Sequence, residues 1–356
     1  IGAAIAVAFV AIPLSLAVAL ATGVAPQVAL ISAVIGGILG AVFGGSRLGI
    51  TGPAVAMSVL LAGVLQDFGF AGLLIVGLIC GLLQISLGIL KLGRIAKYIP
   101  LSLVLAFTAG IGFLLFFEQL PYAFQIAGQT NNTITQTYSN LHLYAHHVSS
   151  AGFGLAALTI AILTIVPRFL PRAYAFFFAV LIPMTLAHVT NISVATVGML
   201  PHDIFHPTVI DFNLINDWPK LALTGLEVFI LASLETLLSL SAVDLMGKGD
   251  LHNPSQELIG QGVANIGVAL FGGIPVSGIV ARSSVNVLAG AKTRRAAIFH
   301  ALIILIVVYC VPQVIEMMPV AVLSGILIAA AFKMMNIRQV ESVLVRRLNI
   351  SPCGVQ

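Results

Sequence analysis

The stretch FGGSRLGITGPAVAMSVLLAG, residues 43–63, decides the fold, because a related stretch, FGGIPVSGIVARSSVNVLAG, returns at residues 271–290. The two stretches match at both ends, with a one-residue gap between them. Each overlaps a short apolar segment, 53–66 or 276–289, that opens beside glycine and proline. Such interrupted segments, at matching positions of two halves, are typical of the binding site in transporters built from internal repeats.

The composition excludes most soluble proteins. Of the 356 residues, 59% are hydrophobic and only 8% are charged, and the mean hydropathy is +1.11. A soluble domain carries about 25% charged residues, so neither a cytosolic enzyme nor a nucleic-acid binder fits. The sequence offers no nucleophile–base pair, phosphate loop or metal triad, which argues against an enzyme and against a cofactor.

Apolar segments fill most of the chain, and a helix that crosses the hydrocarbon layer needs about 20 such residues. A second pair of similar stretches, PLSLVLA at 100–106 and PVAVLSG at 319–325, follows the first pair in the same order. The pattern predicts a polytopic all-α membrane protein. Its expected spans are roughly 2–22, 27–43, 53–66, 70–90, 99–117, 151–166, 173–189, 221–246, 256–271, 276–289, 296–312 and 319–335.

The basic residues predict the orientation. When the first helix starts in the cytoplasm, fourteen of the sixteen Lys and Arg residues fall on the cytoplasmic side, as the positive-inside rule requires. Only Lys220 and Arg282 are left over. The two copies of the repeat are then inverted: segment 53–66 runs outward and segment 276–289 runs inward. The polar and basic stretch 336–356 is expected to be a cytoplasmic tail.

Ionisable side chains inside the spans are the strongest functional candidates, because charge at membrane depth is costly. Glu235 lies in the middle of a span, and Ser239 lies one turn later on the same face. We expect a cation-coupling role for this pair, with a structural carboxylate as the alternative. Arg282 falls within the short segment 276–289, where it faces an anion or, alternatively, forms a packing ion pair.

Other polar residues have simpler interpretations. Gln261, Asn265 and Asn286 are expected to form hydrogen bonds between helices. The spacing of His202 and His206 would suit a metal on a helix, but Pro201 and Pro207 bracket the pair, so we expect a solvated loop and no metal site.

The geometry of the repeat predicts an anion site. Half-helices starting at Pro53 and near Val276 would point their N-termini at each other, and each N-terminus offers unpaired N–H groups and about half a positive charge. Arg282 adds one full charge, and Ser277 can donate its hydroxyl hydrogen. Gly52 and Gly278 allow the backbone to approach closely.

Several motifs together resemble the SulP family of sulfate permeases, which is SLC26-like, and the resemblance covers nearly the whole chain. They are Ile12-Pro-Leu-Ser-Leu-Ala17, Phe43-Gly-Gly-Ser-Arg47, Ile50-Thr-Gly-Pro53, Glu235-Thr-Leu-Leu-Ser239, His252-Asn253, Glu257-Leu-Ile-Gly-Gln-Gly262, Ala264-Asn265 and Phe271-Gly-Gly-Ile-Pro275 to Arg282.

The resemblance implies a fold of seven-plus-seven inverted repeats in which a core moves against a gate, like an elevator. The core would comprise about 1–98 and 221–295, and the gate about 99–220 and 296–335. The family's last two helices and its cytoplasmic STAS domain have no counterpart after the twelfth segment, so the resemblance implies a truncated chain. It also implies a homodimer in the plasma membrane, of the bacterial inner-membrane type.

The resemblance further assigns an anion site lined by the first, third and tenth helices. The matching positions here are Leu14, Val18, Ala54, Val55 and Ser277 through Arg282. The family's acidic residue on the eighth helix falls on Glu235. Leu14 replaces a polar residue of some members, which makes this wall more apolar.

Three classes of function stay open at this stage. The first is secondary active transport of sulfate or bicarbonate, coupled to H⁺ or Na⁺. The second is an uncoupled anion exchanger or channel, or a dicarboxylate transporter, on the same fold. The third is a carrier of a neutral solute such as a nucleobase. Glu235 favours coupled transport, and Arg282 favours an anion over a neutral solute.

Overall fold

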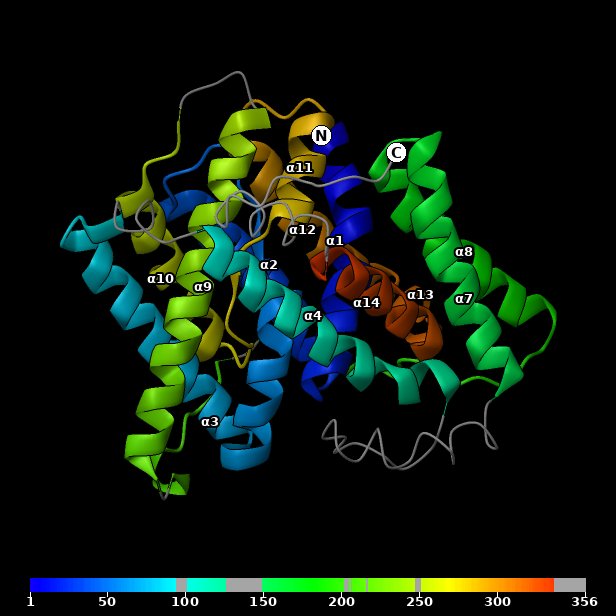
Figure 1. Cartoon of the computed structure of the whole chain (residues 1–356), viewed down its shortest axis with the longest axis horizontal. Coiled ribbons are helices and arrows are strands. Elements are labelled where there is room, and N and C mark those ends of the chain that lie inside the picture. Colours follow the sequence, from blue (N-terminus) through cyan, green and yellow to red (C-terminus); the bar gives the residue numbers. More distant parts are fainter. Residues whose placement is uncertain are drawn as a thin grey trace, which may run out of the picture.

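The computed structural model describes residues 1–93, 101–125, 149–201, 205, 207–215, 217–246 and 251–335. The predicted tail at 336–356 and the His202/His206 pair lie outside these residues. Figure 1 shows a bundle of helices. They are α1 (Gly2–Thr22), α2 (Pro26–Phe43), α3 (Val55–Ile89), α4 (Leu101–Phe124), α7 (Ser150–Ile165), α8 (Arg172–Val189), α9 (Trp218–Met246), α10 (Pro254–Leu270), α11 (Val280–Leu288), α12 (Arg295–Cys310), α13 (Pro312–Glu316) and α14 (Val320–Met334).

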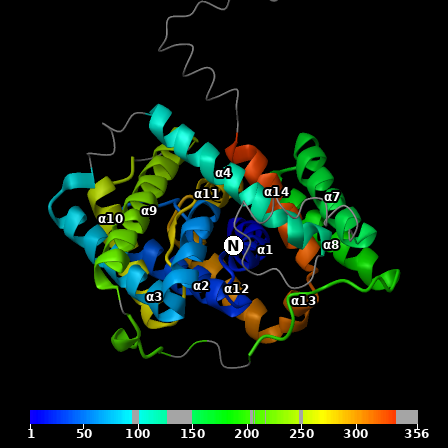
Figure 2. The same ribbon diagram turned by 60° about the horizontal axis from the view of Figure 1, so that its bottom comes forward.

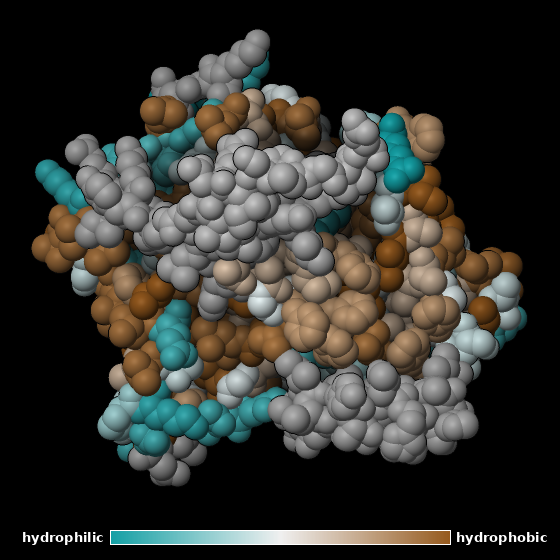
Figure 3. Space-filling model, viewed as in Figure 1, coloured by the Kyte–Doolittle hydropathy of each residue, from teal (hydrophilic) through white to brown (hydrophobic). Residues whose placement is uncertain are grey.

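The helices are apolar enough for a bilayer. Within the described residues, five helical stretches are long and apolar enough to cross a membrane, and three apolar helices are shorter. On the face shown in Figure 3, apolar residues dominate the middle of the described surface, and hydrophilic residues gather toward its edges. A backbone in hydrocarbon has to satisfy its hydrogen bonds internally, which favours helices throughout.

The two predicted short segments are real but begin later than expected. Helix α3 starts at Val55 rather than Pro53, and α11 starts at Val280, not near Val276. Segment 53–66 does not end as a separate helix. It continues to Gly69, whose φ of 66° and ψ of −168° break the helix before segment 70–90 resumes within α3. Glycine tolerates this conformation because it has no Cβ.

Two short strands that periodicity did not predict precede these helices. Strand β1 (Thr51–Gly52) pairs antiparallel with β2 (Ser277–Gly278), with Thr51 opposite Gly278 and Gly52 opposite Ser277. Each strand leads almost directly into its helix, α3 or α11. Because the strands are antiparallel, the helices leave in opposite directions. Their N-termini therefore face the same central region, as the inverted repeat requires.

Helix α1 lies between two groups of helices, as Figures 1 and 2 both show. On one side it packs against α2, α3, α11 and α12, and on the other against α8 and α14. Helix α12 packs chiefly against α1 and α2, although the sequence-based division assigned it to the gate. Its partners belong to the expected core. The division into core and gate as a whole stays a prediction.

Candidate functional site

The β1–β2 pair is the centre of the candidate site, and a buried amide fixes β2. Asn265 of α10 accepts a hydrogen bond from Val276 N at 2.7 Å and donates one to Val276 O at 3.1 Å. It also donates to Gln84 Oε1 of α3 at 2.8 Å. Both sides of one peptide segment are thus held by one side chain. The expected interhelical role of Asn265 is confirmed, and its clamp on β2 is an addition that spacing alone did not indicate.

Strand β1 and the loop before it are held by a second polar set. The Gln261 amide donates to Thr51 Oγ1 at 2.7 Å, and Asn286 donates to Leu48 O at 2.9 Å. Glu257 Oε2 accepts from Gly45 N at 2.7 Å and from Ser46 N at 2.9 Å. Gln261 therefore bonds the Thr51 side chain of β1, and Asn286 bonds the backbone of the loop before β1. Neither bonds a neighbouring helix, which corrects the expected interhelical bonds.

Arg282, on α11, is completely buried. Its Nη2 donates to Ser15 Oγ of α1 at 3.0 Å and to Pro53 O at 3.4 Å. A Cβ placed on Gly52 would lie 2.3 Å from Nη1, so the guanidinium rests against the bare backbone of β1. Among the described residues no carboxylate forms an ion pair with Arg282, and its Nε and Nη1 have no hydrogen-bond partner.

Glu235 reaches β2 from α9. The hydroxyl of Ser277 donates to Glu235 Oε2 at 2.8 Å, and Gly278 N donates to the Thr236 hydroxyl at 2.8 Å. Ser277 is buried, whereas Glu235 retains partial exposure. Ser239 lies buried one turn further along α9. The structure therefore brings Glu235 together with Ser277, which lies in β2 just before α11.

The two helix starts add positive potential to the same place. In this fully described part of the chain, neither α3 nor α11 has a side-chain hydrogen bond at its N-cap. Their first-turn N–H groups are therefore not capped by side chains, and each helix dipole places partial positive charge at its start. Together with Arg282, they form a compact, positively polarised region around β1 and β2.

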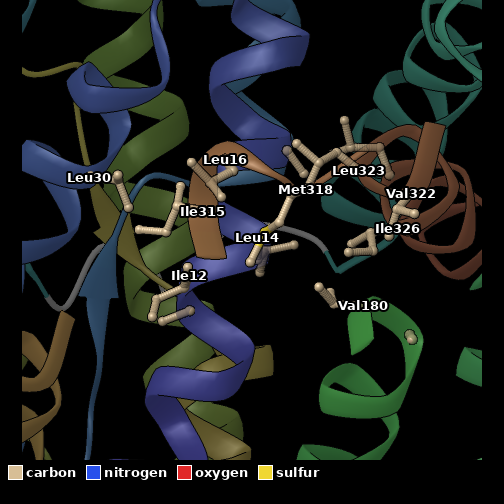
Figure 4. Packing of buried hydrophobic residues seen from close by; sticks show 14 of the residues in the cluster. Ile12, Leu14, Leu16, Leu30, Val180, Ile315, Met318, Val322, Leu323 and Ile326 are labelled. Atoms are coloured by element: carbon tan, nitrogen blue, oxygen red, sulfur yellow. The ribbon is translucent and has the colours of Figure 1, made fainter. Parts of the chain in front are cut away.

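The positions assigned by resemblance form the apolar neighbourhood of this region. Leu14, Val18 and Ala54 are buried, and Val55 is partly exposed at the start of α3. Val55 packs against the clusters of both Leu14 and Val18. Figure 4 shows Leu14 among Ile12 and Leu16 of α1 and Met318 of the α13–α14 turn, which belong to the same cluster. Leu14 thus lies where the two groups of helices meet.

Sequence reasoning missed three contributors to the site. Ser15 accepts from Arg282, Thr236 accepts from Gly278, and Gln84 supports Asn265. Ser15 and Thr236 stood within quoted motifs, but helical spacing did not show what they would contact. Gln84 carried a weaker signal, as an uncharged polar residue within a long apolar segment.

Two helices start from one paired segment, inside a bundle of apolar helices with a buried cation and a carboxylate. This is the arrangement of multi-pass membrane proteins of the inverted-repeat kind. The family model described as "Sulfate permease family" matches residues 1–351. The chain belongs to this family, as the sequence motifs predicted.

The relatives agree with this assignment. The chain is 32% identical over 359 residues to "Putative sulfate transporter YvdB" of Bacillus subtilis (strain 168), covering 96% of this chain and 65% of that protein. It is 27% identical over 339 residues to "Bicarbonate transporter BicA" of Picosynechococcus, covering 87% of this chain and 56% of that protein. The chain thus spans about half to two thirds of the length of these relatives.

Solved structures show the same fold. The transmembrane domain of a cyanobacterial bicarbonate transporter BicA superposes with a TM-score of 0.87 at 24% identity, covering 94% of this chain and 88% of that one. A structure of SLC26A9 gives a TM-score of 0.86 at 16% identity, covering 97% of this chain and 59% of that one. The predicted fold class, an all-α membrane protein with the SLC26-type inverted-repeat fold, is confirmed.

Proposed function

We propose that this chain transports an inorganic anion, sulfate or bicarbonate, by secondary active transport. One observation carries the proposal: Arg282 is fully buried without a carboxylate partner among the described residues, beside two helix N-termini that no side chain caps. Burying an unpaired charge is costly. A bound anion would compensate that charge and would accept hydrogen bonds from the first-turn N–H groups.

The proposed anion site lies between the start of α3 and the start of α11. Gly52 and Gly278 let the backbone come close, and Ser277 and Arg282 supply the polar contacts. Leu14, Val18, Ala54 and Val55 form the apolar wall. This wall excludes water from around the anion and so strengthens the interaction of the anion with the dipoles of α3 and α11.

Glu235 and Ser239 are the proposed cation-coupling residues. An ionised carboxylate at membrane depth is costly, and an arriving H⁺ or Na⁺ would neutralise it. Because Glu235 shares a hydrogen bond with Ser277 of the anion site, its charge state acts directly on anion binding. Cation and anion binding then support each other, and by linkage this support is reciprocal.

The transport cycle we propose is an elevator-like movement of the core against the gate, across the apolar interface around Leu14. We expect the protein to assemble as a homodimer in the plasma membrane. The names of the relatives, a sulfate transporter and a bicarbonate transporter, support both anions. An uncoupled exchanger or channel, or a dicarboxylate transporter, is the alternative.

Uptake of labelled sulfate and bicarbonate into proteoliposomes tests the proposal. We expect accumulation of at least one of these anions above its equilibrium level under an inward H⁺ or Na⁺ gradient, and none without a gradient. Equilibration that ignores both gradients would establish the uncoupled exchanger or channel. Accumulation of a dicarboxylate without either inorganic anion would establish the dicarboxylate alternative.

A further inference from the structure

A stripe of polar side chains follows one face of α10 and holds both strands of the site. Glu257, Gln261 and Asn265 are spaced four residues apart, so they lie on the same face of this helix. All three side chains are buried. Asn265 holds β2 through its two hydrogen bonds with Val276. Gln261, one turn earlier, reaches the other strand, β1.

The amide of Gln261 uses both hydrogens of its nitrogen. Nε2 lies 2.9 Å from Glu257 Oε1 and 2.7 Å from Thr51 Oγ1. Glu257 lies in the first turn of α10, where the helix dipole favours a negative charge, and an ionised carboxylate only accepts hydrogen bonds. The amide atom that faces Glu257 therefore has to be the nitrogen. Since one hydrogen goes to Glu257, the other goes to the Thr51 hydroxyl, which accepts it.

The side chain of Thr51 is fixed from two sides. A Cβ placed on Gly40 of α2 would lie 2.8 Å from Thr51 Cβ and closer still to its hydroxyl oxygen, so this side chain rests against the bare backbone of α2. On its other side, the hydroxyl bonds Gln261 of α10. Thr51 is buried. It therefore anchors β1 to α2 and α10 on the face of the strand that is turned toward these helices.

The next residue of β1 presents the opposite face to Arg282, because successive residues of a strand point to opposite sides. A Cβ placed on Gly52 would meet the guanidinium at Nη1, and Pro53 O accepts a hydrogen bond from Nη2 at 3.4 Å. Helix α3 then starts at Val55. A displacement of Thr51 therefore moves the backbone under the guanidinium and the start of α3, which are two parts of the proposed anion site.

We propose that Gln261 is a positioning residue of the anion site, and that it acts through the Thr51 hydroxyl on the backbone of Gly52. Glu257 sets the direction of the amide, so that its nitrogen faces Thr51. The bond between Gln261 and Thr51 keeps Gly52 against the guanidinium of Arg282 while the anion binds. This inference rests on the proposed role of Arg282 and of the two helix starts in anion binding.

The experiment compares the dissociation constants of sulfate and bicarbonate in two Thr51 variants. Thr51→Val keeps the shape of the side chain but removes the hydroxyl, whereas Thr51→Ser keeps the hydroxyl. A net hydrogen bond changes an equilibrium constant about threefold to tenfold, so we expect Thr51→Val to weaken anion binding by that factor. Thr51→Ser should bind like wild type. Thr159→Val is the matched control and should also bind like wild type, because the buried Thr159 hydroxyl bonds Leu155 O of α7 and Ala179 O of α8.

Gln261→Met tests the other end of the same bond. It keeps a similar volume but donates no hydrogen bond, so we expect a similar loss of anion affinity. Because Gln261→Met and Thr51→Val break one bond, the double variant should lose no more than the weaker-binding single variant. Losses that add fully in the double variant would overturn the inference. If Gln261→Met does not fold, the comparison of Thr51→Val with Thr51→Ser decides.

Each constant is measured on protein whose folding is verified by thermal unfolding. A merely structural role of the bond would lower stability and leave the affinity of the folded protein unchanged. Wild-type affinity in folded Thr51→Val protein would therefore overturn the inference, as would an equal loss in Thr51→Ser.

Arg282→Ala separates this inference from the proposed function. Weakened binding in Arg282→Ala, together with wild-type binding in Thr51→Val, refutes the inference alone. Unchanged binding in folded Arg282→Ala protein refutes the anion role of Arg282 and the inference with it.

Discussion

The clamp formed by Asn265 predicts a large loss of stability when its amide is removed. Asn265→Leu keeps a similar volume but deletes three hydrogen bonds, two to Val276 and one to Gln84. Asn265 is fully buried, so water does not replace these partners. An unsatisfied buried polar group costs about 1–3 kcal/mol. With at least Val276 N and Gln84 Oε1 left unpaired, we expect a loss of about 2–6 kcal/mol in the free energy of unfolding.

Reversible unfolding in mixed detergent micelles measures this change. Thr185→Val is the matched control, because the Thr185 hydroxyl bonds only within its own helix on an exposed face, and we expect it to stay within about 0.5 kcal/mol of wild type. Gln84→Leu provides a second check. Because Gln84 and Asn265 share one bond, the double variant should lose less than the sum of the single variants. A change in Asn265→Leu no larger than in Thr185→Val would refute the clamp.

Two further predictions follow from the same region. In Gly52→Ala, the added Cβ would lie 2.3 Å from Arg282 Nη1, so the guanidinium has to move and we expect anion affinity to fall about tenfold. Gly63→Ala is the control in the helix that follows β1, because a Cβ there meets nothing within 4 Å. Equal affinities in both variants would contradict the prediction. Glu235→Gln keeps the shape and the hydrogen-bond acceptor for Ser277 but removes the charge. We therefore expect gradient-driven accumulation in proteoliposomes to disappear while anion exchange persists. Accumulation equal to wild type would reduce Glu235 to a structural carboxylate.

Much of the fold could be predicted because apolar segments and their interruptions are one-dimensional features. The short segments at 53–66 and 276–289 indicated the inverted repeat, and in the structure both lie at the paired strands β1 and β2. The pairing itself was not predictable from periodicity, because strands of two residues have no repeating pattern to detect. The helix starts were also predicted a few residues early. Pro53 and Ala54 precede the start of α3, with Ala54 in an extended conformation, and strand β2 lies between Pro275 and the start of α11.

For the candidate site, the sequence indicated residues but not their contacts. Glu235 and Arg282 were chosen because they lie within predicted membrane spans, where a charged side chain is costly and therefore indicates a function. Helical spacing then suggested Ser239 as the partner of Glu235, whereas the hydroxyl that bonds it belongs to Ser277, on a strand distant in sequence. Ser15 opposite Arg282 is a similar case. Such pairs depend on tertiary packing, which no local pattern encodes.

The central claim is that the buried charge of Arg282 and the two helix starts around it bind an inorganic anion. Direct binding of labelled sulfate and bicarbonate to purified wild type and Arg282→Ala, with folding verified by thermal unfolding, tests it most directly. A charge interaction in a partly wet cavity contributes about 1–3 kcal/mol, so we expect the dissociation constant of the bound anion to rise about tenfold to a hundredfold. Folded Arg282→Ala protein that binds the anion as tightly as wild type would contradict the account.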